Sequence, residues 1–228
     1  PFEGDVAIVG DRISAVARRI AERGAEEIDA RGLAVAPGFI DIHSHTDSTV
    51  LVEPHAPGKL LQGVTTEIVG ADGGSMGPWT DEQFERQRER WRERSGIDID
   101  FRDPVGFMRF VRRMGSAANL FSMIGAGSVR AFVMGEDDRP PTEAELARMV
   151  AEVESAIAGG AVGLSSGLEY TPGGFADRDE LVALASELRG TGLPYASHMR
   201  NEDDALLGAI EEAIHVGRVA GVPVQISH

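Results

Sequence analysis

The feature that most constrains the fold is a repeated alternation of short apolar segments and helical patterns, which begins at Phe39. Repeated strand–helix units imply parallel strands. Six such units without a GxGxxG fingerprint favour an α/β fold of the (β/α)₈ barrel type over a dinucleotide-binding sheet. The expected strands are residues 39–45, 65–70, 119–126, 161–168, 194–199 and 222–228.

The segments between these strands carry helix signals. Thr142 is followed by Glu145 three residues later, and Asp177 stands in the same relation to Glu180, which predicts two capping boxes. Residues 204–220 place apolar side chains at helical spacing and end before a glycine. The sequence therefore predicts helices over the intervals that join the parallel strands.

The first 36 residues differ from the rest of the chain. Residues 5–16 read as strand, turn and strand, with a Gly-Asp pair at the bend. Residues 27–30 and 33–36 are expected to form further short strands. Pro37-Gly38 then marks the entry to the barrel pattern. We therefore expect two parts, a small β domain over residues 1–36 and the barrel portion over residues 37–228.

The number of strands is small for a closed barrel. Such a barrel needs eight strands and typically about 250 residues, whereas six strands are read from this sequence and the last of them ends it. We therefore expect the chain to be a fragment of a longer protein, cut at both ends, and to be inactive by itself.

Charge and composition exclude several classes of partner. The chain has a net charge of -15 and a pI near 4.8, and an acidic surface repels nucleic acid and anionic membranes. The arginines of residues 86–94 alternate with glutamates, which predicts a solvated helix with internal ion pairs. Absence of cysteine excludes disulfides and thiolate ligands and fits a cytoplasmic protein. No apolar run approaches the roughly 20 residues that span a bilayer.

Histidines concentrate at the carboxyl ends of the expected strands. In (β/α)₈ barrels the functional residues lie at that end, and imidazole is a common ligand of zinc and similar ions. This pattern predicts a metal centre, whereas a single histidine there would usually be structural. Four of the six histidines follow the pattern, namely His43, His45, His198 and His228, and the exceptions are His55 and His215.

A loop after the second expected strand offers a carboxylate. Asp72 lies within residues 63–78, GVTTEIVGADGGSMGP. A carboxylate can bridge two cations with its two oxygens. The alternative is that Asp72, between Ala71 and two glycines, only forms a turn. We favour the ligand, because Asp72 follows a strand end on the expected face.

Five segments together resemble a known family. The strings PGFIDIHSHTD, GVTTEIVGADG, GLSSGLEYTPG, YASHMRNED and PVQISH are similar in order and spacing to the N-acyl-D-amino-acid deacylase (D-aminoacylase) branch of the metal-dependent amidohydrolase superfamily. The HxH motif alone would indicate only the superfamily. The resemblance implies a small β-sandwich, to which residues 1–36 would contribute, and a metal-dependent (β/α)₈ barrel.

The resemblance also implies an activity and a ligand set. The expected reaction is hydrolysis of small N-acyl-D-amino acids to a carboxylate and a free D-amino acid, with Zn²⁺ as cofactor in the form of one or two divalent ions. His43 and His45 would belong to one metal position, and His198 and His228 to the other. D-aminoacylases commonly have a cysteine as the shared ligand, where this sequence has Asp72.

The same resemblance implies roles for other residues. Tyr170 is expected to hold the oxyanion of the substrate, although it could simply pack in its loop. Arg200 and Glu202 are expected to orient ligands or the loop after the fifth strand, with a surface ion pair as the alternative. The general base, an aspartate ending the eighth strand, is expected beyond His228. Relatives that bridge their metals with a carboxylated lysine are disfavoured, because the one lysine, Lys59, precedes the second strand.

Two alternatives remain open at this point. The protein could hydrolyse another linear amide or a D-peptide, or it could be a catalytically inactive relative that still binds metal. The residues that set specificity and supply the general base lie largely outside the motifs quoted above.

Overall fold

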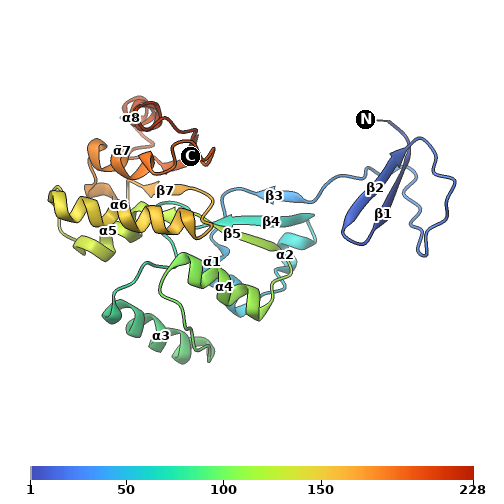
Figure 1. Cartoon of the computed structure of the whole chain (residues 1–228), viewed down its shortest axis with the longest axis horizontal. Coiled ribbons are helices and arrows are strands. Elements are labelled where there is room, and N and C mark those ends of the chain that lie inside the picture. The colour runs from blue at the N-terminus through green and yellow to red at the C-terminus, as the bar shows by residue number, and fades with distance from the viewer. Residues whose placement is uncertain (1) are drawn as a thin grey trace. The chain divides into compact units, whose positions relative to one another are not determined.

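A computed structural model describes residues 2–228, which divide at the Pro37–Gly38 junction into two compact units (Figure 1). The first unit contains an antiparallel hairpin of β1 (Asp5–Val9) and β2 (Arg12–Ala17). Its turn contains Gly10 with φ 62°, which glycine adopts without strain. The predicted hairpin is confirmed.

The prediction of two further strands in the first unit is wrong. Residues 27–30 and 33–36 have no strand assignment. The apolar side chains of Ile28, Leu33 and Val35 are exposed, so the alternation there buries no face. A short apolar segment becomes a strand only when a neighbouring strand satisfies its backbone groups.

The second unit is built on parallel strands, as predicted. One sheet has the order β3-β4-β5 and the other the order β6-β7-β8-β9, and every neighbouring pair is parallel. The strands are β3 (Phe39–Asp41), β4 (Val64–Val69), β5 (Asn119–Ser122), β6 (Ile124–Gly125), β7 (Leu164–Gly167), β8 (Tyr195–His198) and β9 (Val224–Ile226). The unit is therefore of the α/β class.

The expected strand over residues 119–126 passes from one sheet to the other. Its first part, β5, pairs with β4, and its second part, β6, pairs with β7. At the break between them, the Met123 N–H donates to the Val69 carbonyl at 2.9 Å, and the Ile124 N–H donates to the Gly163 carbonyl at 3.0 Å. One segment of chain therefore joins the two sheets.

Helices connect the strands and carry the predicted caps. They are α1 (Thr46–Val52), α2 (Pro57–Leu60), α3 (Asp81–Ser95), α4 (Pro104–Met114), α5 (Ala126–Met134), α6 (Glu143–Ala158), α7 (Arg178–Ser186) and α8 (Leu206–Ala220), with a 3₁₀ turn η1 (Gly173–Phe175). The capping box of α6 is confirmed. Asp177 caps α7 by accepting from the Glu180 N–H, but the predicted capping box is not completed, because the Glu180 side chain pairs with Arg130 instead. Helix α8 ends at Gly221 in the left-handed conformation.

The arginine-rich segment forms α3, whose arginines are largely solvated as predicted. Only one of its ion pairs is internal, between Arg86 and Glu82 at 3.5 Å. Arg88 and Arg92 instead reach Asp98, beyond the end of the helix, at 2.6 and 2.7 Å. None of the helices among residues 2–228 combines the length and apolar character that a membrane crossing requires.

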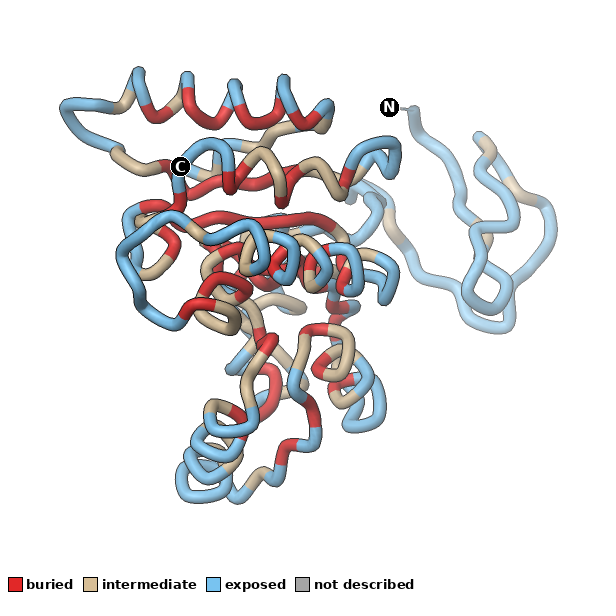
Figure 2. Tube along the Cα trace, turned by 60° about the vertical axis from the view of Figure 1, so that its left-hand side comes forward, coloured by how far each residue is buried: buried red, intermediate tan, exposed pale blue. Residues whose placement is uncertain are grey.

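Buried residues of the second unit lie along the strands and on the inner sides of the helices (Figure 2). Adjacent residues of β4 point to opposite faces, as in any strand. Val69 belongs to a core with residues of α1, α3 and α4. Ile68 packs instead with Ala71, Met123 and Ala196. The strand therefore has a helix-facing side, which carries Val69, and an opposite inner side.

Candidate metal centre

The predicted ligands lie at or just beyond strand ends. His198 is the last residue of β8, His228 lies two residues beyond β9, and Asp72 lies three residues beyond β4. His43 lies two residues beyond β3, and His45 is the N-cap of α1. The strand expected to reach residue 45 therefore ends at Asp41, and both histidines lie in the turn between β3 and α1.

The structure brings these five residues together around Asp72. Its Oδ2 lies 3.3 Å from Nε2 of His43 and 3.1 Å from Nε2 of His45. Its Oδ1 lies 3.7 Å from Nδ1 of His198 and 4.0 Å from Nε2 of His228. Two groups of three possible ligands result, each with its atoms within 4.8 Å of one another, and Asp72 belongs to both.

The residues present fit divalent metal ions. Oδ1 of Asp72 and both ring nitrogens of His198 are buried without a hydrogen-bond partner. An unpaired buried polar atom costs free energy unless another group satisfies it. A cation between Asp72 and the histidines would satisfy atoms of this kind. Imidazole nitrogens and a carboxylate suit zinc, and the two oxygens of Asp72 each face one histidine pair.

Local backbone geometry places Asp72 between the two histidine pairs. Asp72 has φ 52° and Gly73 has φ 73°, so two successive residues adopt the left-handed conformation. The hydroxyl of Ser165 on β7 accepts from the Gly73 N–H at 3.1 Å and donates to the Gly70 carbonyl at 2.6 Å. A Cβ at Gly167 would lie 2.0 Å from the Asp72 carbonyl oxygen. The absence of a side chain at Gly167 therefore permits the close approach of the Asp72 loop.

Two carboxylates lie beside the second histidine pair. Oε1 of Glu202 is 2.7 Å from Nδ1 of His228 and 3.7 Å from Nε2 of His198. Glu169 Oε2 is 3.6 Å from the same His198 nitrogen. A role was predicted for Glu202 from the sequence, but none was predicted for Glu169. Its position two residues after β7, next to Tyr170, was the available signal.

Tyr170 lies beside the same histidines. Its ring centroid is 4.7 Å from that of His198, and 51% of the residue is exposed. Partial removal from water, together with the nearby charges of Asp72, Glu169 and Glu202, raises the pKa of Tyr170. Its hydroxyl therefore remains a proton donor at neutral pH.

Arg200 holds the loop that follows Tyr170. Its Nε donates to Glu212 on α8 at 2.9 Å, and its other nitrogens donate to the carbonyls of Gly174 at 2.6 Å and Ala176 at 2.7 Å. These contacts tie η1 and the residue after it to α8. The hydrogen bonds and ion pairs that the structure records for Arg200 do not include a ligand histidine.

The remaining histidines and the lysine lie outside the two ligand groups. His55 and His215 are exposed, and neither belongs to a ligand group. Lys59 lies on α2 and forms an ion pair with Asp41 of β3. Glu67, a carboxylate on β4 that is only 2% exposed, was not predicted from the sequence. A charged residue inside the strand pattern VTTEIV was the signal for it.

Comparison with known proteins points to the same family as the sequence motifs. Residues 26–97 match the model of the amidohydrolase family. An N-acyl-D-aspartate deacylase of Alcaligenes xylosoxydans xylosoxydans is 36% identical over 99% of this chain and 45% of its own length. The chain thus spans about half the length of the curated relatives it matches.

Solved structures agree with this result. A crystal structure of D-aminoacylase has a TM-score of 0.86 and 34% identity over 99% of this chain and 47% of that one. N-acyl-D-glutamate deacylase from Bordetella bronchiseptica, in complex with zinc and a phosphonate inhibitor, has a TM-score of 0.81 and 30% identity over 97% of this chain and 46% of that one. The chain matches the amidohydrolase family model over residues 26–97 and resembles the N-acyl-D-amino-acid deacylases over nearly its whole length.

Proposed function

We propose that the protein carrying this sequence is a zinc-dependent hydrolase of N-acyl-D-amino acids. The observation that carries the proposal is the convergence of two histidine pairs on the two oxygens of Asp72. Similarity along nearly the whole chain to deacylases of this substrate class, including one in complex with zinc, supports it.

The proposal includes an assignment of the two units. Residues 1–36 contribute to a small β-sandwich, and residues 37–228 form the N-terminal portion of a (β/α)₈ barrel. The parallel order of β3 to β9 and the position of the candidate ligands at strand ends support the barrel. The likeness to D-aminoacylase at a TM-score of 0.86 supports it as well.

Five residues would hold the metal. His43, His45 and Asp72 would bind one ion, and Asp72, His198 and His228 would bind the other. When bound, zinc supplies a Lewis acid and lowers the pKa of water at the site toward neutrality. As the residue shared by both groups, Asp72 would supply an anionic oxygen ligand where D-aminoacylases commonly have a cysteine sulfur.

The surrounding side chains prepare the site. Glu202 accepts a hydrogen bond from Nδ1 of His228, which fixes the proton on that nitrogen and leaves Nε2 free toward Asp72. Tyr170 would donate a hydrogen bond from its hydroxyl to the substrate carbonyl oxygen, which gains negative charge as the carbonyl is attacked. Arg200 holds the loop that carries Tyr170. A small N-acyl-D-amino acid is the substrate, and the net charge of -15 disfavours nucleic acid and anionic membranes as partners.

A substrate panel tests the proposal. The full protein that carries this sequence, purified and supplied with zinc, should release free amine from N-acetyl-D-aspartate, N-acetyl-D-glutamate or N-acetyl-D-methionine. The matching L-isomers serve as controls and should not be cleaved. Release from other linear amides or D-peptides only would assign a different substrate class. Absence of release from the whole panel, with zinc bound, would favour an inactive relative.

A further inference from the structure

Glu67 is a buried carboxylate on the side of β4 that faces away from the candidate metal centre. It is 2% exposed and shares the helix-facing side of the strand with Val69, two residues later. An isolated buried carboxylate is costly, because water no longer solvates its charge. Its partners therefore indicate why a charge is kept at this position.

Those partners come from the turn that carries the first histidine pair. The Ser44 hydroxyl donates to Oε2 of Glu67 at 2.7 Å, and the Thr46 hydroxyl donates to the same oxygen at 2.9 Å. Ser44 is itself 2% exposed and stands between His43 and His45. Its N–H also donates to the carbonyl of Ile68 at 3.0 Å. Glu67 and its neighbour thus hold the central residue of the HxH motif at two points.

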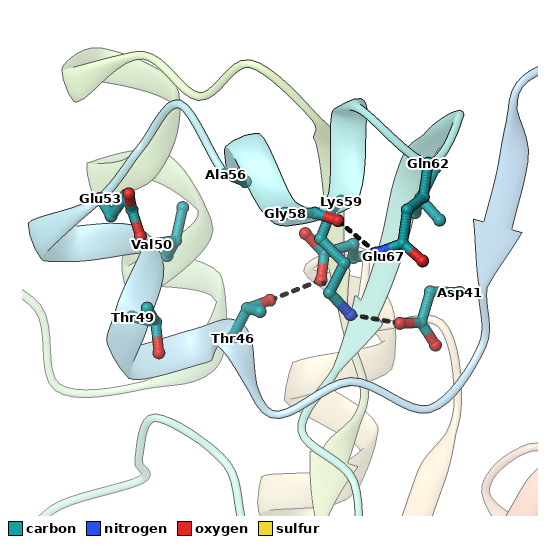
Figure 3. A pocket seen from close by; sticks show the side chains of 11 residues that line it. Asp41, Thr46, Thr49, Val50, Glu53, Ala56, Gly58, Lys59, Gln62 and Glu67 are labelled. Carbon is teal, nitrogen blue, oxygen red and sulfur yellow. Dashed lines mark hydrogen bonds and ion pairs between the residues drawn. The ribbon is translucent and has the colours of Figure 1, made fainter.

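Lys59 completes the cluster from α2. Its Nζ is 3.3 Å from Oε2 of Glu67 and forms a closer ion pair with Asp41. Figure 3 shows the Lys59 side chain reaching toward Asp41, with Thr46 directed at Glu67 from α1. The hydrogen bond with Asp41, reinforced by Glu67, raises the pKa of Lys59, so its ammonium is charged at neutral pH. The Lys59 ammonium therefore forms ion pairs with the carboxylates of both Asp41 and Glu67.

Asp41 extends the cluster to the other side of the histidine motif. Its Oδ1 accepts from the His43 N–H at 3.2 Å. The backbone of His43 is thus held by Asp41, and the following residue, Ser44, is held by Glu67. Rotation of the backbone at this turn would move the imidazoles of His43 and His45 relative to Oδ2 of Asp72, which lies 3.3 and 3.1 Å from them.

We propose that Glu67, held by Lys59, is a positioning residue that sets the geometry of the metal position formed by His43, His45 and Asp72 through its hydrogen bond with Ser44. The inference rests on the metal centre of the proposed function and adds a group that contacts no ligand side chain. The second position, at His198 and His228, lies on β8 and β9 and receives no contact from this cluster.

A cavity makes conservative variants practical. A space of about 480 Å³ adjoins the cluster and is lined by Asp41, Thr46, Lys59 and Glu67 among others. Substitutions that keep the size of the side chain leave this space and the adjoining core as they are. Glu67→Gln keeps the shape and removes the charge, and Ser44→Ala removes only the hydroxyl. Lys59→Arg keeps the cation, whereas Lys59→Met removes it.

The matched control is a second buried carboxylate that pairs with arginine. Glu180 on α7 is 2% exposed and forms an ion pair with Arg130 on α5. Its recorded contacts are with α5 and with its own helix start, and none involves the histidine turn. Glu180→Gln therefore reports the general effect of neutralising a buried carboxylate on stability. It should leave zinc affinity unchanged.

Zinc affinity of the full protein, measured by competition with a chromogenic chelator, is the readout. Glu67→Gln and Ser44→Ala should each weaken one zinc-binding step by roughly 10- to 100-fold, the range for partners that orient a ligand. Lys59→Met should do the same, and Lys59→Arg should restore binding. Cobalt substitution should show an altered absorption spectrum in Glu67→Gln and an unaltered one in Glu180→Gln.

The histidine variants assign the effect to one position. Glu67→Gln should weaken zinc binding further in a His228→Ala background and should add little in a His45→Ala background, where the affected position is already lost. Unchanged zinc affinity in both Glu67→Gln and Ser44→Ala would overturn the proposal, as would an equal effect in both backgrounds. Wild-type protein that binds zinc but cleaves no substrate would refute the proposed function alone.

Discussion

Asp72 is the residue shared by both groups of possible metal ligands. Its two oxygens face two different histidine pairs. Asp72→Asn keeps the shape but removes the charge, so zinc binding should weaken at both positions by more than the roughly 10- to 100-fold typical of an orienting partner. Zinc content after dialysis measures this, with His45→Ala as the variant that should lose one position only. Retention of wild-type zinc content in Asp72→Asn would contradict the bridging role.

The candidate ligands were predictable from the sequence because each follows a strand that the sequence also predicts. His198 ends β8, and Asp72 follows β4 within a loop rich in glycine. Glu67 and Glu169 were not predicted. A carboxylate inside a strand reads as an exposed residue until the partners on other segments are known, and Ser44 and Lys59 lie 23 and 8 residues away in the sequence.

At the scale of elements, the Asp72 loop approaches β7 so closely that position 167 has no room for a side chain. A Cβ there would lie 2.0 Å from the Asp72 carbonyl oxygen, which is backbone and cannot rotate away. Gly167→Ala should therefore destabilise the protein by about 1–3 kcal/mol, as overpacking does, and should also weaken zinc binding. Urea unfolding and chelator competition measure the two effects.

Gly208 provides the control for that substitution. It lies within α8, and a Cβ there would meet no atom within 4 Å. Gly208→Ala should stabilise the protein by about 0.5–1 kcal/mol, because alanine is the better helix former, and zinc binding should not change. Equal stability and zinc affinity in both alanine variants would mean that the loop tolerates displacement.

The elements themselves were predicted with uneven success, for a physical reason. The parallel strands and capped helices of the second unit carry local signals, such as the Thr142 capping box. The break at Met123 depends on which sheet each half of the segment joins, and no local pattern encodes it. Residues 27–30 and 33–36 have strand-like composition but no strand partner, so composition alone misled the prediction.

At the scale of the second unit, the candidate metal centre joins its two sheets. His43 and His45 follow β3 of the three-stranded sheet, whereas His198 ends β8 and His228 follows β9 in the four-stranded sheet. Between the sheets, residues 119–126 are continuous in the backbone. Metal bound to both histidine pairs through Asp72 would therefore add a further connection between the sheets, at the carboxyl ends of their strands.

Zinc should consequently raise the thermal stability of the full protein. A ligand that binds only the folded state stabilises it by about 2.7 kcal/mol at a concentration 100 times its Kd. This corresponds to an increase in Tm of roughly 5–10 °C for a domain of about 150–250 residues, and to a smaller increase for a longer protein. Scanning calorimetry with zinc and with a chelator measures the difference. The double variant His45→Ala/His198→Ala, with one ligand removed from each sheet, should show a much smaller zinc-dependent shift than wild type. The same Tm for wild-type protein in zinc and in chelator would mean that the five residues do not form a metal-dependent link between the sheets.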